Sequence, residues 1–137
     1  SRVRDAAAVA AVWQSLLGFL LRLRTRNQRW RVYPATLVNE NRWRAQRYGA
    51  EAKLVDHGRQ RLAPFADLVE EILELTLPDA ETLGCRAELL HARRIAAEGD
   101  SAARQRAAYA QARRDGAEDH EALCAVVDGL IAEFRED

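Results

Sequence analysis

Apolar residues recur along most of this chain at intervals of three and four, which is the period of an amphipathic α-helix and the strongest constraint on its fold. Proline and glycine interrupt the pattern, and polar residues that can cap a helix stand at several of the interruptions. We therefore predict helices at about residues 5–23, 39–49, 64–78, 86–98, 101–114 and 119–134, with a short helical turn at 79–83.

The first predicted helix carries large apolar residues on one broad face and is expected to be a central core helix. This face comprises Val9, Val12, Trp13, Leu16, Leu17 and Leu20. The apolar run from Ala6 to Leu21 is too short to span a bilayer, and Gln14 and Ser15 interrupt it. Arginines rather than a small-residue cleavage site follow the run, so we predict no signal peptide, no membrane association and a cytoplasmic location.

The other boundaries follow from local chemistry. Asn39 can cap the second helix and Gly49 can end it, whereas Pro64 suits a first helical turn. Pro78 is expected to end the third helix, and Ser101 is expected to cap the fifth. Residues 51–56 and 60–63 flank His-Gly-Arg and predict a small hairpin. The predicted fold class is all-α, with five or six helices in an orthogonal or bundle-like packing, one small β-hairpin and a single domain over residues 1–137.

The inward stripes of the later helices are predicted to be core rather than cofactor-binding surfaces. They comprise Phe65, Leu68, Val69, Ile72 and Leu75 in the third helix and Leu123, Val127, Leu130 and Phe134 in the sixth.

An arginine-rich segment is the main candidate for binding chemistry. Residues 39–49 read Asn-Glu-Asn-Arg-Trp-Arg-Ala-Gln-Arg-Tyr-Gly, so Arg42, Arg44 and Arg47 lie within a few turns of one predicted helix. Guanidinium groups stay charged and match the geometry of phosphate and carboxylate, which favours a site for a nucleotide or an acidic substrate. Spacing alone favours a simpler interpretation, in which Glu40 and Arg44 form an exposed ion pair and the other arginines are solvated.

We predict no metal site in this chain. Its two cysteines and three histidines lack the spacing of a zinc site. Glu70, Glu71 and Glu74 could share a cation, but their position on the outer face of an amphipathic helix favours solvation.

Charge is distributed unevenly although the net charge is zero. Residues 1–50 contain ten arginines and only two acidic residues, and a basic segment with interleaved aromatic residues could bind nucleic acid. This segment comprises Arg22, Arg24, Arg26, Arg29 and Arg31 with Trp30 and Tyr33. Since Lys53 is the only lysine, we favour a basic loop that docks on acidic protein surface. A nucleic-acid-binding module and a helical protein-interaction module remain the alternatives.

The order of residues in the arginine-rich segment resembles the C-terminal signature of the carboxylate–amine ligases of the glutamate–cysteine ligase type 2 family. The Asp-Ala-rich stretch 5–11 and Leu-Gly-Cys-Arg-Ala-Glu-Leu at 83–89 resemble further segments of that family in the same order, as do residues 93–95 and 99–105. The resemblance covers nearly the whole chain.

This resemblance implies an ATP-dependent enzyme in which ATP phosphorylates a carboxylate and an amine then displaces the phosphate to form an amide. It further implies that the chain is the C-terminal part of a longer ligase, whose N-terminal catalytic region would be its partner. ATP and Mg²⁺ would serve the full-length enzyme, and we expect no cofactor in this fragment and no activity from it alone. Small-molecule carboxylate and amine substrates are implied. Asn41, Arg42, Arg44 and Arg47 are the residues expected to line the nucleotide or acyl-phosphate end of the site, with Trp43 as a packing anchor.

Overall fold

The computed structural model describes residues 3–29 and 32–136, and within these residues it contains six α-helices and one two-stranded antiparallel sheet. In chain order the elements are α1 (Val3–Thr25), α2 (Ala35–Tyr48), the 3₁₀ turn η1 (Gly49–Glu51), β1 (Lys53–Asp56), β2 (Arg61–Pro64), α3 (Phe65–Leu83), α4 (Arg86–Glu98), α5 (Ser101–Arg114) and α6 (Asp119–Glu136). The predicted all-α class with one small hairpin is confirmed.

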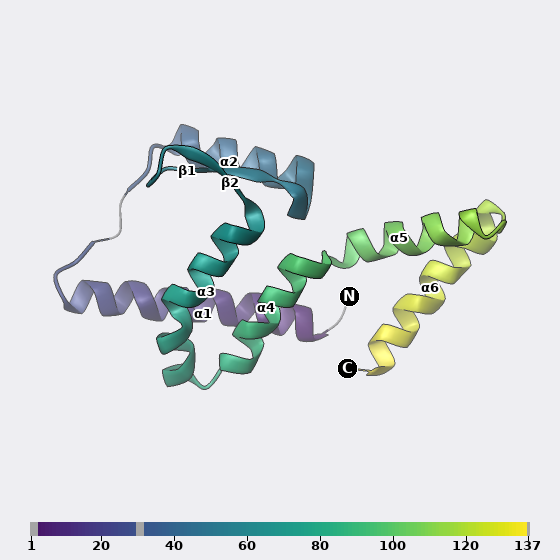
Figure 1. The fold of residues 1–137 in the computed structure, drawn as a ribbon. Helices are drawn as coiled ribbons and strands as arrows, with labels where there is room; N and C mark the ends of the chain where they lie inside the picture. Colours follow the sequence, from purple (N-terminus) through teal and green to yellow (C-terminus); the bar gives the residue numbers. More distant parts are fainter. Residues whose placement is uncertain (1–2, 30–31, 137) are drawn as a thin grey trace.

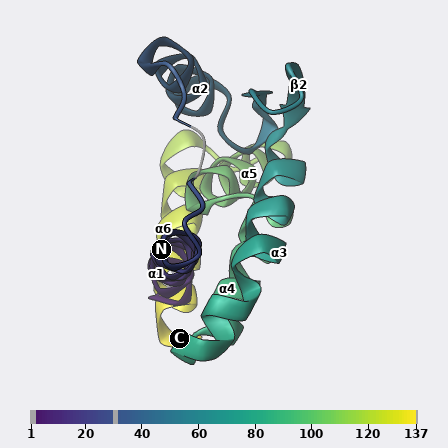
Figure 2. The same cartoon turned by 90° about the vertical axis from the view of Figure 1, so that its left-hand side faces the viewer.

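The elements form three groups (Figure 1). Helices α1, α3 and α4 pack on one another, α2 lies beside the β-hairpin at the start of α3, and α5 and α6 form a helical hairpin that extends beyond α4. Seen after a quarter turn, α1 and α6 lie along one side of the molecule, whereas α3 and α4 lie along the other (Figure 2).

The core lies between α1, α3 and α4 and is built largely from small side chains. Its buried members are Ala8, Ala11, Leu73, Ala80, Leu89 and Ala92. Alanines at a helix contact allow the helix axes to approach closely, because the distance between packed helices depends on the side chains between them. Leu73 and Leu89 are the largest fully buried apolar residues of this cluster.

The predicted core face of α1 is wrong for its outermost residues. Trp13 is 63% exposed, and Val9 and Leu17 are more than half exposed, whereas Ala8 and Ala11 on the opposite side of the helix are buried. The helix is apolar all round, so its period could not indicate which side meets α3 and α4. The alanine side does so because it admits the closer contact.

The predicted core stripe of α6 is wrong for a similar reason. Leu123, Val127 and Phe134 are exposed, and only Leu130 of the predicted stripe is half-buried. Ala122 is the fully buried residue of α6, on the side of the helix that faces α5.

Two helix starts differ from the prediction. Helix α2 begins at Ala35 after Pro34, so Asn39 lies inside the helix and does not cap it. Asp100, not Ser101, caps α5, because its side chain accepts a hydrogen bond of 2.7 Å from the backbone N–H of Ala103. Gly49 ends α2 as predicted, with a φ of 55° that residues with a side chain rarely adopt.

Pro78 does not end α3, which continues to Leu83. An internal proline costs about 3 kcal/mol because it removes one helical hydrogen bond. The turn beyond it is nevertheless held by burial of Asp79 and Ala80 and by two hydrogen bonds from Arg22 to Asp79, of 3.1 and 2.7 Å. Gly18 of α1 permits this contact, since a Cβ at that position would lie 3.3 Å from the Cβ of Asp79.

Candidate functional site

Helix α2 lies against the free edge of β1 through a side-chain clamp at Asn41. The Asn41 Nδ2 donates to the Val55 carbonyl over 2.9 Å, and the Val55 N–H donates to Asn41 Oδ1 over 2.6 Å. Val55 stands opposite Leu62 in the hairpin, with its own backbone groups turned outward to the clamp. One amide side chain thus replaces the hydrogen bonds of a third strand.

Arg44 strengthens the same junction. Its Nε donates to Glu40 Oε1 over 2.7 Å, and its Nη1 lies 3.4 Å from the Lys53 carbonyl. The contact expected from spacing alone, an ion pair between residues four apart, is therefore present. Asn41 and Arg44, two of the four predicted site residues, make structural hydrogen bonds that orient α2.

The other two predicted site residues are exposed. The Arg47 guanidinium lies 6.0 Å from the Tyr48 ring, and Arg42 makes no hydrogen bond or ion pair with the described part of the chain. They are five positions apart in the sequence, which places them about 140° apart around the helix axis. The four residues consequently do not converge on one point within this chain, and their role in ligand binding stays a prediction.

Trp43 was expected to be a buried packing anchor, and this expectation is wrong. Its side chain is 50% exposed and meets the ring of Tyr48 edge to face, at a centroid distance of 6.0 Å. Trp43 and Tyr48 thus form an aromatic pair on the surface of α2, beside the Arg47 guanidinium.

A groove of about 750 Å³ lies between α2, the hairpin and α3. Its volume falls in the range of ligand-binding pockets, about 300 to 1,000 Å³. Its apolar lining includes Val38, Leu54, Phe65, Leu68, Ile72 and Leu75. Much of the α3 stripe predicted to be core therefore lines this groove, and Ile72 and Leu75 are exposed in it.

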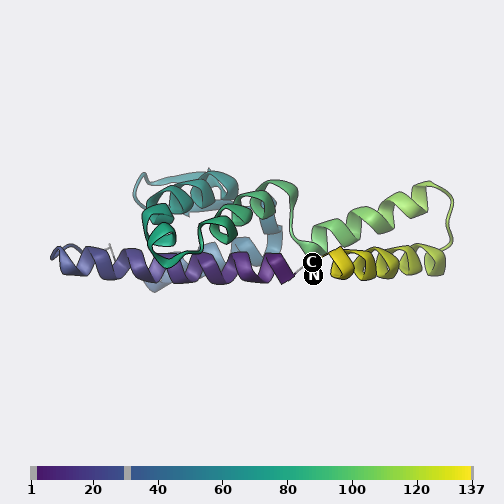
Figure 3. The same ribbon diagram turned by 90° about the horizontal axis from the view of Figure 1, so that it is seen from below.

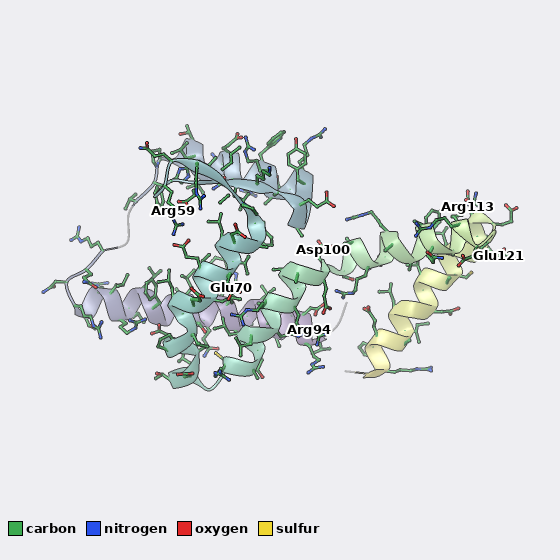
Figure 4. The ribbon with its side chains drawn as sticks, in the orientation of Figure 1. Arg59, Glu70, Arg94, Asp100, Arg113 and Glu121 are labelled. Atoms are coloured by element: carbon green, nitrogen blue, oxygen red, sulfur yellow. The ribbon has the colours of Figure 1, made fainter. Side chains whose placement is uncertain are left out.

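The rim of the groove carries a group of ionic residues that spacing did not indicate. Arg59 contacts Glu71 over 2.8 Å and Asp56 over 2.9 Å, reaching from the hairpin toward α3 (Figure 4). The hydrogen bonds that Arg59 donates to Glu71 and Asp56 raise the pKa of Arg59, and the bond to Asp56 lowers the pKa of that carboxyl group. Glu71 comes from α3, twelve residues away, so no local motif could have revealed this contact.

His57 stands in the same groove with an unsatisfied nitrogen. Its Nε2 is buried without a hydrogen-bond partner, and its ring lies 4.7 Å from the ring of Tyr33. Buried polar groups usually have a partner, so this nitrogen can receive a hydrogen bond from, or donate one to, a molecule that enters the groove. The sequence placed His57 in a turn and gave it no zinc-site spacing, so it did not indicate a role in a groove.

These contacts bear on the nucleic-acid alternative. Arg22 is paired with Asp79 and is not free to track a phosphate backbone, and Tyr33 faces His57 inside the groove and is not free to stack on a base. Arg29 lines the groove. Trp30 and Arg31, which belong to the same proposed segment, lie outside the described residues.

The predicted acidic face of α3 is used for ion pairs. Glu70 pairs with Arg93 and Glu71 with Arg59, so two of its three carboxylates are not merely solvated. Among the residues that the structure describes, no group of three or more His, Cys, Asp or Glu side chains could hold a metal ion.

Comparison with known proteins identifies the family. The sequence model of glutamate–cysteine ligase family 2 matches residues 1–128. The chain belongs to the glutamate–cysteine ligase 2 family. No solved structure matches it.

Curated family members have similar sequences. A Rhodospirillum rubrum protein named "putative glutamate–cysteine ligase 2" is 56% identical over 133 residues, which cover 97% of this chain and 34% of the relative. A protein with the same name from Jannaschia is 46% identical, over 99% of this chain and 36% of the relative. Another from Sorangium cellulosum is 42% identical, over 96% of this chain and 33% of the relative. The chain spans about a third of the length of these ligase relatives.

We expect Asn41→Ala to destabilise this family member by about 1 to 3 kcal/mol, because it leaves both backbone groups of Val55 without a partner. Urea unfolding would measure the loss, and amide exchange at Val55 should accelerate. Gln46→Ala, at an exposed position of the same helix, is the control. Equal stability of the two variants would show that the clamp contributes nothing.

Proposed function

We propose that the chain is the helical C-terminal part of an ATP-dependent carboxylate–amine ligase that resembles glutamate–cysteine ligase. The observation that carries the proposal is the family match over residues 1–128, together with relatives that are named as such ligases and are about three times longer. The isolated chain is expected to be inactive, because the catalytic region would lie in the rest of the ligase.

The proposed reaction has two steps. The γ-phosphoryl group of ATP is transferred to a carboxylate oxygen, which yields an acyl phosphate and ADP. The amine nitrogen then attacks the acyl carbon, inorganic phosphate leaves, and the amine loses a proton to give the amide. Transfer of this kind is catalysed mainly by positioning and by stabilisation of negative charge.

In this proposal, helix α2 supplies positive charge at the nucleotide or acyl-phosphate end of the site. Asn41 and Arg44 hold the helix on β1, while Arg42 and Arg47 leave their guanidinium groups exposed for an anion brought by the rest of the ligase. Mg²⁺ would supply charge neutralisation at the phosphates. The described residues contain no cluster of three or more His, Cys, Asp or Glu side chains that could hold it, so we assign its ligands to the rest of the ligase.

Alanine substitution of Arg42 or Arg47 in the full-length ligase tests the role of α2. We expect kcat for phosphate release, measured with ATP, Mg²⁺, glutamate and cysteine, to fall by roughly 10²- to 10³-fold. The Tm should hardly change, because an exposed arginine contributes little to stability. Arg44→Ala should lower the Tm as well, since it breaks contacts with Glu40 and Lys53.

Arg94→Ala is the matched control, because Arg94 is an exposed arginine of α4 whose partner is Glu98 on the same helix. Normal turnover of both the Arg42 and the Arg47 variants would remove α2 from the site. Absence of substrate-dependent phosphate release from the unmodified full-length protein would overturn the ligase proposal itself.

A further inference from the structure

Helix α1 has a large apolar surface that nothing in the described structure covers. Its alanine side packs against α3 and α4, while a row of larger residues at four-residue intervals faces away from them. The exposed row is Val9, Trp13, Leu17 and Leu21. A helix that is apolar all round normally has all its sides buried, so this side lacks a partner.

Helix α6 repeats the arrangement. Its α5-facing side carries Ala122, which is fully buried, and the half-buried Leu130. The large residues point away from that side, at three- and four-residue intervals. They are Leu123, Val127, Ile131 and Phe134, all of them exposed.

The two helices that carry these rows lie on the same side of the molecule (Figure 2). Seen from below, α3, α4 and α5 all lie on one side of α1 and α6 (Figure 3), and α6 runs obliquely to α1 (Figure 1). We call the eight exposed residues of the two rows the α1–α6 flank. At 1.5 Å per residue the two rows measure about 18 and about 17 Å along their helices.

An ionic junction connects α6 to α1 through α5. Arg104 of α5 donates to Asp5 of α1 over 2.9 Å and to Glu133 of α6 over 3.1 Å. His91 of α4 lies 2.9 Å from the other oxygen of Asp5. One group of side chains thus joins four helices and holds α6 in a fixed position relative to α1.

We propose that the α1–α6 flank is the surface on which the rest of the ligase chain docks. This inference rests on the proposed function, in which the chain is one part of a longer ligase. Soluble monomers rarely expose a continuous apolar patch of more than a few hundred Å². The two rows, about 18 and about 17 Å long and about 10 Å wide, together offer about 350 Å², a large part of the roughly 800 Å² that each partner contributes to a stable interface.

The length of the relatives identifies the occupant. About two thirds of each relative lies outside the region that matches this chain, so the remainder of such a protein is large enough to cover the flank.

Helix α1 is the one described helix that is long and apolar enough to cross a membrane, which by itself is weak evidence of a span. Its packing on α3 and α4 prevents lipid from surrounding it, so protein is the better occupant.

Co-production with a defined partner tests this surface. The chain would be tagged and co-expressed with the remaining two thirds of the Rhodospirillum rubrum relative as a separate polypeptide. We expect a one-to-one complex by size-exclusion chromatography with light scattering. The double substitutions Trp13→Glu with Leu17→Glu, and Val127→Glu with Ile131→Glu, should each weaken it by about tenfold or more, because a buried unpaired charge is costly.

Val32→Glu is the control, since Val32 is exposed but lies in no helix and outside the flank. Thermal melts followed by circular dichroism should show that the variants fold. Maleimide labelling gives a second readout, in a background with Cys85 and Cys124 replaced by serine. The variant Leu17→Cys should react in the 137-residue chain and be protected in the full-length ligase, whereas Val32→Cys should react in both.

Four results would overturn the proposal. The first is a complex that the flank substitutions leave intact, and the second is labelling of Leu17→Cys in the full-length ligase. The third is a homodimer of this chain that Trp13→Glu with Leu17→Glu abolishes. The fourth is co-sedimentation with phosphatidylcholine–phosphatidylglycerol vesicles that the same two substitutions abolish. A flank-dependent complex that releases no phosphate would support the docking surface and count against the ligase function.

Discussion

Replacement of Leu89 by alanine is expected to lower the free energy of unfolding by about 2 to 5 kcal/mol. Leu89 is fully buried in α4, where it belongs to the core shared with α1 and α3. Loss of its isobutyl group removes apolar contacts and leaves a cavity among alanines, whose short side chains cannot fill it. Urea unfolding would measure the change, and the Tm should fall by about 2–4 °C for each kcal/mol.

Leu62→Ala is the control, because half of the Leu62 side chain is exposed on the hairpin. It should change stability far less than the core substitution. Leu73→Ala, at the other large buried residue of the core, should resemble Leu89→Ala. If both core variants lost less than about 1 kcal/mol, the three-helix core described here would not be the main source of stability.

Replacement of Arg104 by alanine is expected to detach the α5–α6 hairpin from the rest of the molecule. The substitution removes the hydrogen bonds that Arg104 donates to Asp5, Glu133 and the Gly99 carbonyl, so two half-buried carboxylates each lose one partner. Loss of partners for such groups costs about 1 to 3 kcal/mol or more. Amide exchange should accelerate throughout α5 and α6 while the core amides of α1, α3 and α4 remain protected.

The pH dependence of that effect has a definite sign. Burial raises the pKa of Asp5, but hydrogen bonds from His91 and Arg104, together with their charges, outweigh it and lower the pKa. The contribution of Asp5 is therefore complete above the unfolded-state pKa of about 3.9 and is lost as the pH falls through the lower folded-state value. The difference between the wild type and Arg104→Ala should shrink below about pH 4. Arg94→Ala, which breaks only an exposed pair, should leave amide exchange unchanged.

The sequence was sufficient to predict the elements because their signals are local. Apolar periodicity, the prolines and the glycines located six helices and the hairpin, and Gly99 closes α4 where it was expected. The order of motifs also indicated the family. Local signals failed where tertiary contacts decide the outcome, as at Pro78. A proline usually ends a helix, but α3 continues because Asp79 is buried and pairs with Arg22.

The candidate site was less predictable for the same reason. Asn41 was selected as a ligand-binding residue, but the structure uses its amide to hold a strand fourteen residues away. The pairing of Arg59 with Glu71 and the contact of His57 with Tyr33 join segments that no motif connects. Spacing can indicate which side chains share a helix face, but it cannot reveal which distant backbone or ring will meet them.

The clamp at Asn41 also affects what the hairpin can do with other molecules. A two-stranded sheet has two open edges, and an open edge can recruit a strand from a second chain and begin aggregation. The amide of Asn41 occupies the outward N–H and C=O of Val55, and the Arg44 guanidinium lies beside the carbonyl of Lys53. Helix α2 therefore keeps this edge closed to intermolecular strand pairing.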